Sequence, residues 1–286
     1  MTKLDPRRHV YRGDLAAETL RGSVDAKRYV AGETRQVAAP SLPLRREPRF
    51  DAPLDTEMLH GETVTLYDEQ EGWAWVQLHH DNYVGYVPSG GLVTDVTAPT
   101  HRVSVLRTYV FPEPDSKVPP LAMLSLNARI PVEKIAGRYL RLRNGGFVYA
   151  RHALPVGDLA QDYVTVAEGF LGTPYLWGGR TSVGLDCSGL VQLAVAAAGH
   201  AVPRDADMQA AEAGHAVDWQ AAALERGDLV FWDGHVGLMT SPESFLHANA
   251  HHMAVEREPL SEARDRIKAA GFEVTGVRRL PRGRHG

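Results

Sequence analysis

A loose internal repeat in the first half of the chain limits most strongly what this protein can fold into. Residues 72–92 (GWAWVQLHHDNYVGYVPSGGL) and 137–154 (GRYLRLRNGGFVYARHAL) share a glycine, an alternating strand, a polar turn, a Gly-aromatic-Val step and a closing leucine. Alternation of aromatic or apolar residues with polar ones is typical of half-buried strands. Two copies predict two similar small β-barrels.

The composition changes on both sides of this repeat. Residues 1–50 are rich in charge and proline and show weak periodicity, which predicts an arm that becomes ordered on contact. Proline and glycine turns at 88–91 and 97–99 separate the two copies. The chain of 286 residues is long enough for two or three domains. We expect the arm at 1–50, small β-barrels at 51–98 and 99–156, and another domain at 157–286.

The pattern after Pro155 is mixed α and β. Residues 158–172 have apolar residues at helical intervals and end in Gly172. A second helix is predicted within residues 184–199, where Asp186 can cap the N-terminus. The segments DLVFW, HVGLMT, SFLHANA and MAVERE then indicate successive strands. Helices followed by hairpin strands predict an α+β domain.

The sequence has one cysteine, Cys187. A single thiol cannot form an intrachain disulfide or anchor a cysteine-rich zinc site, so it is either an inert buried group or a reactive one. In the first turn of the predicted helix it meets the partial positive charge of unpaired backbone N–H groups. That charge favours the thiolate, and the same N–H groups can receive an oxyanion.

A cysteine nucleophile needs an imidazole that activates it and later protonates the leaving group, and the imidazole needs a polar group that fixes its tautomer. His235 opens the strand HVGLMT, and His247 lies in the next strand. A hairpin between these strands can bring the two rings side by side. The spacing alone leaves the structural interpretation open, in which a buried cysteine and scattered histidines have no chemical role.

Composition excludes some classes of partner. The formal net charge of −4 provides no bulk attraction to nucleic acid or to an anionic membrane. The longest apolar run, residues 190–199, is too short to span a bilayer, and the first residues lack the apolar segment of a signal peptide. We therefore expect a globular protein of the cytoplasm that binds neither nucleic acid nor membrane.

Several linked motifs resemble those of the NlpC/P60 cysteine peptidases. They are LGTPYLWGGRTSVGLDCSGLVQ, PRDADMQ, GDLVFW, HVGLM and FLHANAHHMAVEREPL, in that order. The resemblance covers residues 158–283 and implies a papain-like α+β fold, with helices packed on an antiparallel sheet. The upstream repeat resembles the paired bacterial SH3-like domains of the γ-D-glutamyl-L-diamino acid endopeptidases in this family.

The resemblance assigns roles to four residues. Cys187 in Asp-Cys-Ser-Gly would be the nucleophile, His235 in His-Val-Gly the general base and acid, and His247 in His-Ala-Asn the group that orients His235. Tyr175 would place its hydroxyl near the oxyanion, or it is an aromatic ring packed on the helix. The resemblance implies no metal and no cofactor.

It also implies the substrate: peptidoglycan (murein) stem peptides with a free N-terminal L-Ala, cut between γ-D-Glu and lysine or meso-diaminopimelate in cell-wall recycling. Asp186, Ser188, Tyr83 and Glu62 resemble the residues that hold the amine. Each has a structural alternative. Asp186 can be only a helix cap and Ser188 a first-turn partner, while Tyr83 can be a barrel aromatic and Glu62 a solvated turn charge.

One position departs from the family pattern. Ala206 stands after Pro-Arg-Asp where some relatives have a substrate-binding serine, so a hydrogen bond to the N-terminal residue is missing or comes from Asp207. We interpret Arg204 and Asp205 as a structural ion pair or loop fasteners.

Other function classes fit the sequence less well. A metal hydrolase could use His247, His251 and His252, but the chain has no HExxH motif. The segment GGRTSVG lacks the Lys-Ser/Thr ending of a phosphate-binding loop. A non-catalytic protein that binds cell-wall fragments through its barrels is the remaining alternative, and the intact Cys187, His235 and His247 set argues against it.

Overall fold

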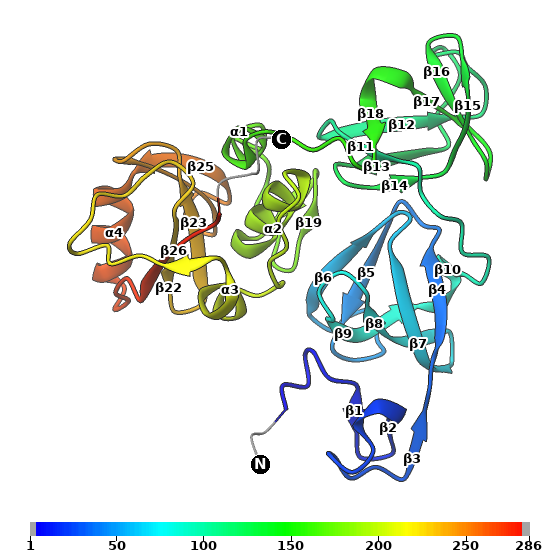
Figure 1. Ribbon diagram of the computed structural model, residues 1–286, viewed down its shortest axis with the longest axis horizontal. Coiled ribbons are helices and arrows are strands. Elements are labelled where there is room, and N and C mark those ends of the chain that lie inside the picture. The colour runs from blue at the N-terminus through cyan, green and yellow to red at the C-terminus, as the bar shows by residue number, and fades with distance from the viewer. Residues whose placement is uncertain (1–3, 282–286) are drawn as a thin grey trace. The chain divides into compact units, whose positions relative to one another are not determined.

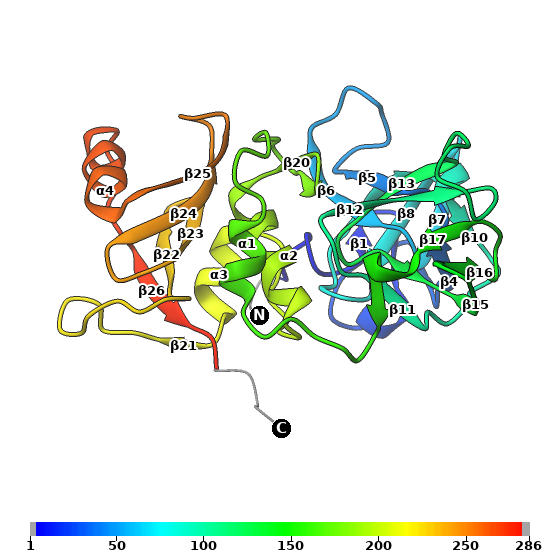
Figure 2. The same cartoon turned by 90° about the horizontal axis from the view of Figure 1, so that it is seen from above.

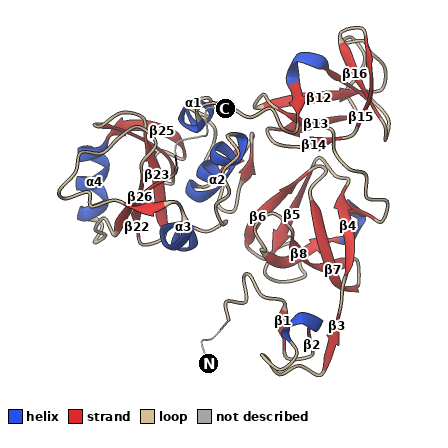
Figure 3. Ribbon diagram, viewed as in Figure 1, coloured by secondary structure: helices blue, strands red, loops and turns tan. Residues whose placement is uncertain are grey.

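The computed structural model describes residues 4–281 and divides the chain into two compact units, residues 1–156 and 157–286 (Figure 1). Strands occur in both units, whereas the α-helices of the described residues all lie in the second (Figure 3). No helix in residues 4–281 is long and apolar enough to cross a membrane.

The first unit begins with a three-stranded sheet in the order β1-β2-β3, followed by a seven-stranded antiparallel sheet in the order β10-β4-β7-β8-β9-β5-β6. The strands are β1 (Tyr11–Arg12), β2 (Leu15–Ala17), β3 (Arg28–Val30), β4 (Glu33–Val37), β5 (Ser41–Arg45), β6 (Leu54–Leu59), β7 (Thr63–Gln70), β8 (Trp73–Leu78), β9 (Val84–Pro88) and β10 (Leu92–Val93). Short 3-10 turns span Glu18–Leu20 and Ser89–Gly91.

The segment expected as an arm contributes strands to this unit. β4 pairs with β7, and β5 pairs with β6 and β9. Leu15 is fully buried in one cluster with Trp75 and Val84. Burial of such side chains orders the segment, although its strands are too short to show a clear period in the sequence. The first sheet therefore starts well before residue 51.

Residues 99–156 form a further all-β part of the first unit, with sheets in the orders β14-β11-β18 and β13-β12-β17-β16-β15. Its strands are β11 (His101–Val103), β12 (Arg107–Phe111), β13 (Ala122–Ser125), β14 (Arg129–Ile130), β15 (Val132–Ala136), β16 (Tyr139–Leu142), β17 (Phe147–Tyr149) and β18 (Ala153–Pro155), with a 3-10 turn at Ala150–His152. It has its own buried cluster around Val103, Leu124 and Val148. A second SH3-like barrel remains a prediction.

The second unit is built on an antiparallel sheet in the order β21-β26-β22-β23-β24-β25. Its strands are β21 (His215–Ala216), β22 (Leu229–Trp232), β23 (His235–Met239), β24 (Ser244–Asn249), β25 (Ala254–Pro259) and β26 (Gly276–Arg279), and a small hairpin joins β19 (Arg180–Thr181) to β20 (Gly184–Leu185). The helices are α1 (Tyr163–Glu168), α2 (Cys187–Ala197), α3 (Ala206–Glu212) and α4 (Leu260–Ala269). Figure 2 shows α1, α2 and α3 on one side of the sheet and α4 on the other. This arrangement confirms the α+β fold.

Local signals explain most of these elements. The Asp186 side chain accepts a hydrogen bond from the Gly189 N–H, so α2 begins at Cys187 as predicted. The four predicted strands are β22 to β25. α1 is shorter than expected because Asp162 caps it through the Val164 N–H, which starts the helix at Tyr163. α4 is an additional helix, and it contributes to the candidate site.

Candidate active site

Cys187 is the first residue of α2 and is buried, with 7% of its surface exposed. Backbone groups of Val236 and Ser188 hydrogen-bond to its sulfur. Val236 follows His235 on β23, the strand on which α2 packs. The start of the helix and the start of this strand therefore bring the thiol and the His235 backbone to the same part of the unit.

A chain of hydrogen bonds leads away from His235. Its Nε2 lies 2.8 Å from His247 Nδ1, and His247 Nε2 lies 2.7 Å from Glu258 Oε1. Both oxygens of Glu258 accept from the Arg266 guanidinium, at 2.5 and 2.6 Å. The side chains of His247 and Glu258 are buried, with 1% and 9% exposed. We call this series, His235, His247, Glu258 and Arg266, the histidine relay.

The relay fixes the tautomers of both histidines. Arg266 and His247 hold the pKa of Glu258 well below its usual value against the cost of burial, so Glu258 is a carboxylate and can only accept. His247 must then carry its proton on Nε2, and its Nδ1 accepts from His235 Nε2–H. Neutral His235 is left with an unprotonated Nδ1. That nitrogen can act as a base.

The resting charge state differs from the one that the helix position predicts. Burial, together with the Asp186 carboxylate, raises the pKa of Cys187 to about 12, despite the two backbone hydrogen bonds and Arg204. Burial also lowers the pKa of His235 far below its ordinary value, and the charges of His247 and Arg266 act in the same direction. At neutral pH the pair is a thiol and a neutral imidazole, so loss of the thiol proton must accompany attack on a substrate.

Sequence reasoning missed Glu258 and Arg266. Glu256 and Glu258 alternate along β25, so both lie on the face of the strand that pairs with Phe245 and His247. Only the position of α4, which places Arg266 beside Glu258, shows which of the two glutamates is the partner of His247. The helix itself has a sequence signal, because the good helix formers in LSEARDRIKAA precede Gly271, which has a φ of +95°.

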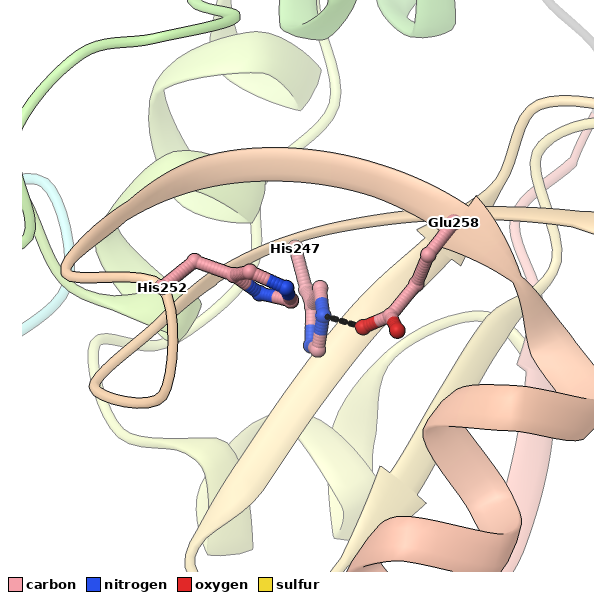
Figure 4. Close-up of side chains that lie close together, drawn as sticks. All are labelled: His247, His252 and Glu258. Atoms are coloured by element: carbon pink, nitrogen blue, oxygen red, sulfur yellow. Dashed lines mark hydrogen bonds and ion pairs between the residues drawn. The ribbon is translucent and has the colours of Figure 1, made fainter.

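His247, His252 and Glu258 also form a possible metal-binding group, since their ligand atoms lie within 4.8 Å of one another (Figure 4). The hydrogen bond in the figure joins His247 Nε2 to Glu258, whose two oxygens already accept from Arg266. A cation here would have to displace the Nε2 proton and compete with a guanidinium. The charge balance of these residues does not favour a metal.

Both carboxylate oxygens of Asp186 accept hydrogen bonds from groups within the second unit. Its Oδ1 accepts from the Gly189 N–H at 2.7 Å and from Arg204 at 2.9 Å, and its Oδ2 accepts from the Gly178 N–H at 2.9 Å and from Arg204 at 2.7 Å. Arg204 also donates to the Ser188 hydroxyl at 2.9 Å. The fully buried Arg204 is thus a fastener, as expected, and its ion pair is with Asp186. These contacts support the capping role for Asp186, while amine binding by Asp186 and Ser188 stays a prediction.

Tyr175 lies within electrostatic reach of Cys187. Burial, with the charges of Cys187 and Asp186, raises the pKa of its hydroxyl, so the group remains a proton donor. A backbone hydrogen bond from the Tyr175 N–H to the Met253 carbonyl holds the residue, at 2.9 Å. This placement is compatible with donation of a hydrogen bond by the Tyr175 hydroxyl to an oxyanion.

Ala206, the position that departs from the family pattern, is buried as the first residue of α3, and the next residue, Asp207, is exposed.

The two predicted amine ligands of the first unit are both buried. Glu62 is 5% exposed, accepts from the Leu59 N–H at 2.8 Å and lies 3.7 Å from His80 Nδ1, so it is not a solvated turn charge. Tyr83 is 4% exposed, and its N–H donates to Asp81 at 3.0 Å. Their role in binding stays a prediction.

A cysteine at the start of a helix that packs on the strand of His235, with His235 hydrogen-bonded to His247 on the next strand, is the arrangement of a cysteine peptidase of the papain-like type. Residues 172–268 match the NlpC/P60 family, and residues 44–92 match the bacterial dipeptidyl-peptidase Sh3 domain. The second unit therefore contains an NlpC/P60 domain, and the protein is a peptidase.

Two curated relatives share one name, which describes a peptidase. The chain is 29% identical to a γ-D-glutamyl-L-lysine dipeptidyl-peptidase of Bacillus subtilis over 235 residues, 74% of this chain and 78% of the relative. It is 26% identical to the protein of the same name in Bacillus cereus over 240 residues, 73% and 71% of the two chains. A crystal structure of an NlpC/P60 family protein from Bacillus cereus has a TM-score of 0.75 and 23% identity, and covers 87% of this chain and 100% of its own, which shows a shared fold.

Proposed function

We propose that this protein is a γ-D-glutamyl-L-diamino acid endopeptidase. It hydrolyses the bond between γ-linked D-Glu and lysine or meso-diaminopimelate in murein stem peptides with a free N-terminal L-Ala. The observation that carries the proposal is the histidine relay on a strand whose next residue, Val236, hydrogen-bonds through its backbone to the Cys187 sulfur. The names of the relatives support the choice of the bond that is cut. We place the reaction in the cytoplasm, in the recycling of wall peptides.

The relay supplies the proton transfers of acyl transfer. The Cys187 thiol gives its proton to His235 Nδ1 as its sulfur attacks the D-Glu γ-carbonyl. The oxyanion that forms accepts hydrogen bonds from the Cys187 backbone N–H at the start of α2 and from the Tyr175 hydroxyl. His247 and the Glu258 carboxylate stabilise the imidazolium that His235 becomes.

The remaining steps return the enzyme to its starting state. His235 gives its Nδ1 proton to the amide nitrogen, the C–N bond breaks, and the peptide that begins with the diamino acid leaves. A water molecule then gives a proton to His235 and attacks the thioester, which releases L-Ala-D-Glu and restores the thiol. The proton count closes with one water consumed.

A buried ammonium must meet carboxylates and other hydrogen-bond acceptors. We infer that Asp186, Ser188, Tyr83 and Glu62 hold the ammonium of L-Ala, as the resemblance implies. The burial of the Asp186 and Glu62 carboxylates supports this role. An N-acetyl group would remove the positive charge and add bulk at the same nitrogen, so an acetylated peptide would bind poorly.

The test is incubation with L-Ala-γ-D-Glu-L-Lys and its diaminopimelate counterpart, with products identified by mass spectrometry. Wild type should release L-Ala-D-Glu, Cys187→Ala should not, and the N-acetylated peptides should be poor substrates. Release by Cys187→Ala would refute the nucleophile, and equal cleavage of acetylated peptide would refute the amine pocket. Glu62→Gln should raise KM for the free peptide more than it lowers kcat.

A further inference from the structure

A cavity of about 330 Å³ opens beside the histidine relay. Its polar lining includes Trp232, Asp233, His235 and Asn249, and its apolar lining includes Ile267 and Phe272. The volume lies in the usual range of small-molecule sites, roughly 300–1,000 Å³. The proposed chemistry uses His235 and two further lining residues, His247 and Arg266, but not the rest of this cavity.

The pairing of the strands explains why these side chains meet. Trp232 pairs with His235 in the β22–β23 ladder, and continuation of the β23–β24 register places Asn249 opposite His235. Residues paired in this way project to the same face of a sheet. This is the face that α4 covers, because Ala263 of α4 belongs to the same buried cluster as Trp232 and Ile267 packs against that cluster. The cavity is therefore bounded by the ends of three strands and by α4.

The cavity lies where the departing residue of the substrate would sit during catalysis. The general acid must reach the amide nitrogen that departs, so the residue carrying that nitrogen lies next to the His235 ring. His235 lines the cavity. A side chain attached to the departing residue can enter the cavity while the nitrogen stays within reach of His235.

The polar groups of the cavity fit a ligand that carries both a carboxylate and an ammonium group. Trp232 Nε1 and Asn249 Nδ2 are buried donors without an acceptor among the described residues, and both residues are over nine-tenths buried. Donors in that state favour a ligand that supplies an acceptor, such as a carboxylate. Asp233 is exposed at the rim and can pair with an ammonium group. Ile267 and Phe272 offer an apolar wall for methylene groups.

We propose that this cavity binds the side chain of the departing diamino acid and makes the enzyme prefer meso-diaminopimelate to lysine. The inference rests on the proposed function and deepens it. Both side chains end in an ammonium, which Asp233 binds, and only diaminopimelate adds a carboxylate, which Asn249 and Trp232 bind. A site with unpaired donors discriminates against a substrate that lacks the acceptor.

The test compares kcat/KM for L-Ala-γ-D-Glu-meso-diaminopimelate and L-Ala-γ-D-Glu-L-Lys. Wild type should favour the diaminopimelate peptide by about tenfold or more, as for a hydrogen-bonded charged group. Asn249→Asp is nearly isosteric and keeps the Oδ1 that accepts from the His252 N–H at 2.8 Å. It replaces the donor with a negative charge, so it should reduce the preference at least about fivefold, chiefly through the diaminopimelate peptide.

Two further variants complete the design. Asp233→Asn should lower kcat/KM for both peptides to a similar extent, because both carry the ammonium. Asp265→Asn makes the same chemical change on the exposed side of α4, outside the cavity lining, and should leave both values unchanged. Circular dichroism of each variant checks that it is folded.

The outcomes separate the two proposals. If wild type cleaves both peptides with equal efficiency, or if Asn249→Asp leaves the ratio unchanged while folded, the cavity assignment is overturned and the endopeptidase activity stands. If wild type cleaves neither peptide, the proposed function fails, and the cavity assignment fails with it.

Discussion

Replacing Glu258 with glutamine should disable the histidine relay without changing its shape. The carboxylate accepts from His247 Nε2 at 2.7 Å and from Arg266 at 2.5 and 2.6 Å. An amide has one acceptor and one donor group, so its oxygen can stay with Arg266 only if its NH2 turns toward His247. His247 would then be protonated on Nδ1, and His235 on its own Nδ1. The nitrogen that should accept the Cys187 proton would no longer be a base.

The expected fall in kcat for Glu258→Gln follows from the loss of a charged hydrogen-bond partner for His247. A hydrogen bond to a charged group contributes about 1.5–3 kcal/mol and a neutral one about 0.5–1.5 kcal/mol, so the imidazolium loses about 1–2 kcal/mol of stabilisation. With about 1.36 kcal/mol per factor of ten in rate, this loss alone lowers kcat about 5- to 30-fold. The change of tautomer adds to it, so at least about tenfold is expected. KM should change little, since Glu258 acts through His247 as a positioning residue.

The assay is the rate of L-Ala-D-Glu release from the tripeptide, measured with varied substrate. Glu256→Gln is the matched control, because it makes the same change two residues earlier on β25. Glu258→Asp keeps the charge and should retain more activity than Glu258→Gln. A kcat for Glu258→Gln within twofold of wild type, or a defect confined to KM, would refute the relay.

Three other properties should follow from the buried charges. Arg204→Met leaves the Asp186 carboxylate unpaired, so urea unfolding should show a loss of about 3–5 kcal/mol in the free energy of unfolding, and a loss below about 1 kcal/mol would contradict the buried pair. Because the pKa of Cys187 is raised to about 12, its alkylation by iodoacetamide should accelerate steadily above pH 7, and an inflection below pH 7 would indicate a thiolate at rest. The lowered pKa of Glu258 stabilises the fold above its unfolded value of 4.5 and less as pH falls below it, so the melting-temperature difference between wild type and Glu258→Gln should shrink in acid, and a constant difference down to pH 2 would argue against this linkage.

The elements that carry Cys187 and the histidine pair could be predicted because they follow from local rules. Asp186 before an apolar helical run is a cap signal, and it places Cys187 in the first turn of α2. The Ser241-Pro242 turn between two strand-like segments predicts the β23–β24 hairpin that brings His235 and His247 together, and the two ring nitrogens lie 2.8 Å apart. The resemblance to a peptidase family added roles to these residues, and the match of residues 172–268 to the NlpC/P60 family confirms the resemblance.

The first unit shows where local rules are insufficient. Residues 33–45 form β4 and β5, although their periodicity is weak, because their partners lie on strands distant in sequence. Short strands gain most of their stability from such pairing and from burial, and neither is visible in a window of a few residues. The same limit applies to α4. The sequence indicates that this helix exists, but only the tertiary structure shows that it lies beside the site.

The sequence by itself determined which residue types are available and where the elements begin: a single cysteine at a helix start and two histidines on neighbouring strands. The tertiary structure decided their chemical state. Burial makes Cys187 a thiol at rest, Arg204 neutralises the capping Asp186, and α4 places Arg266 on Glu258, so that His235 is left with a basic Nδ1. These effects depend on removal from water and on charges brought together from distant segments, and neither follows from order along the chain.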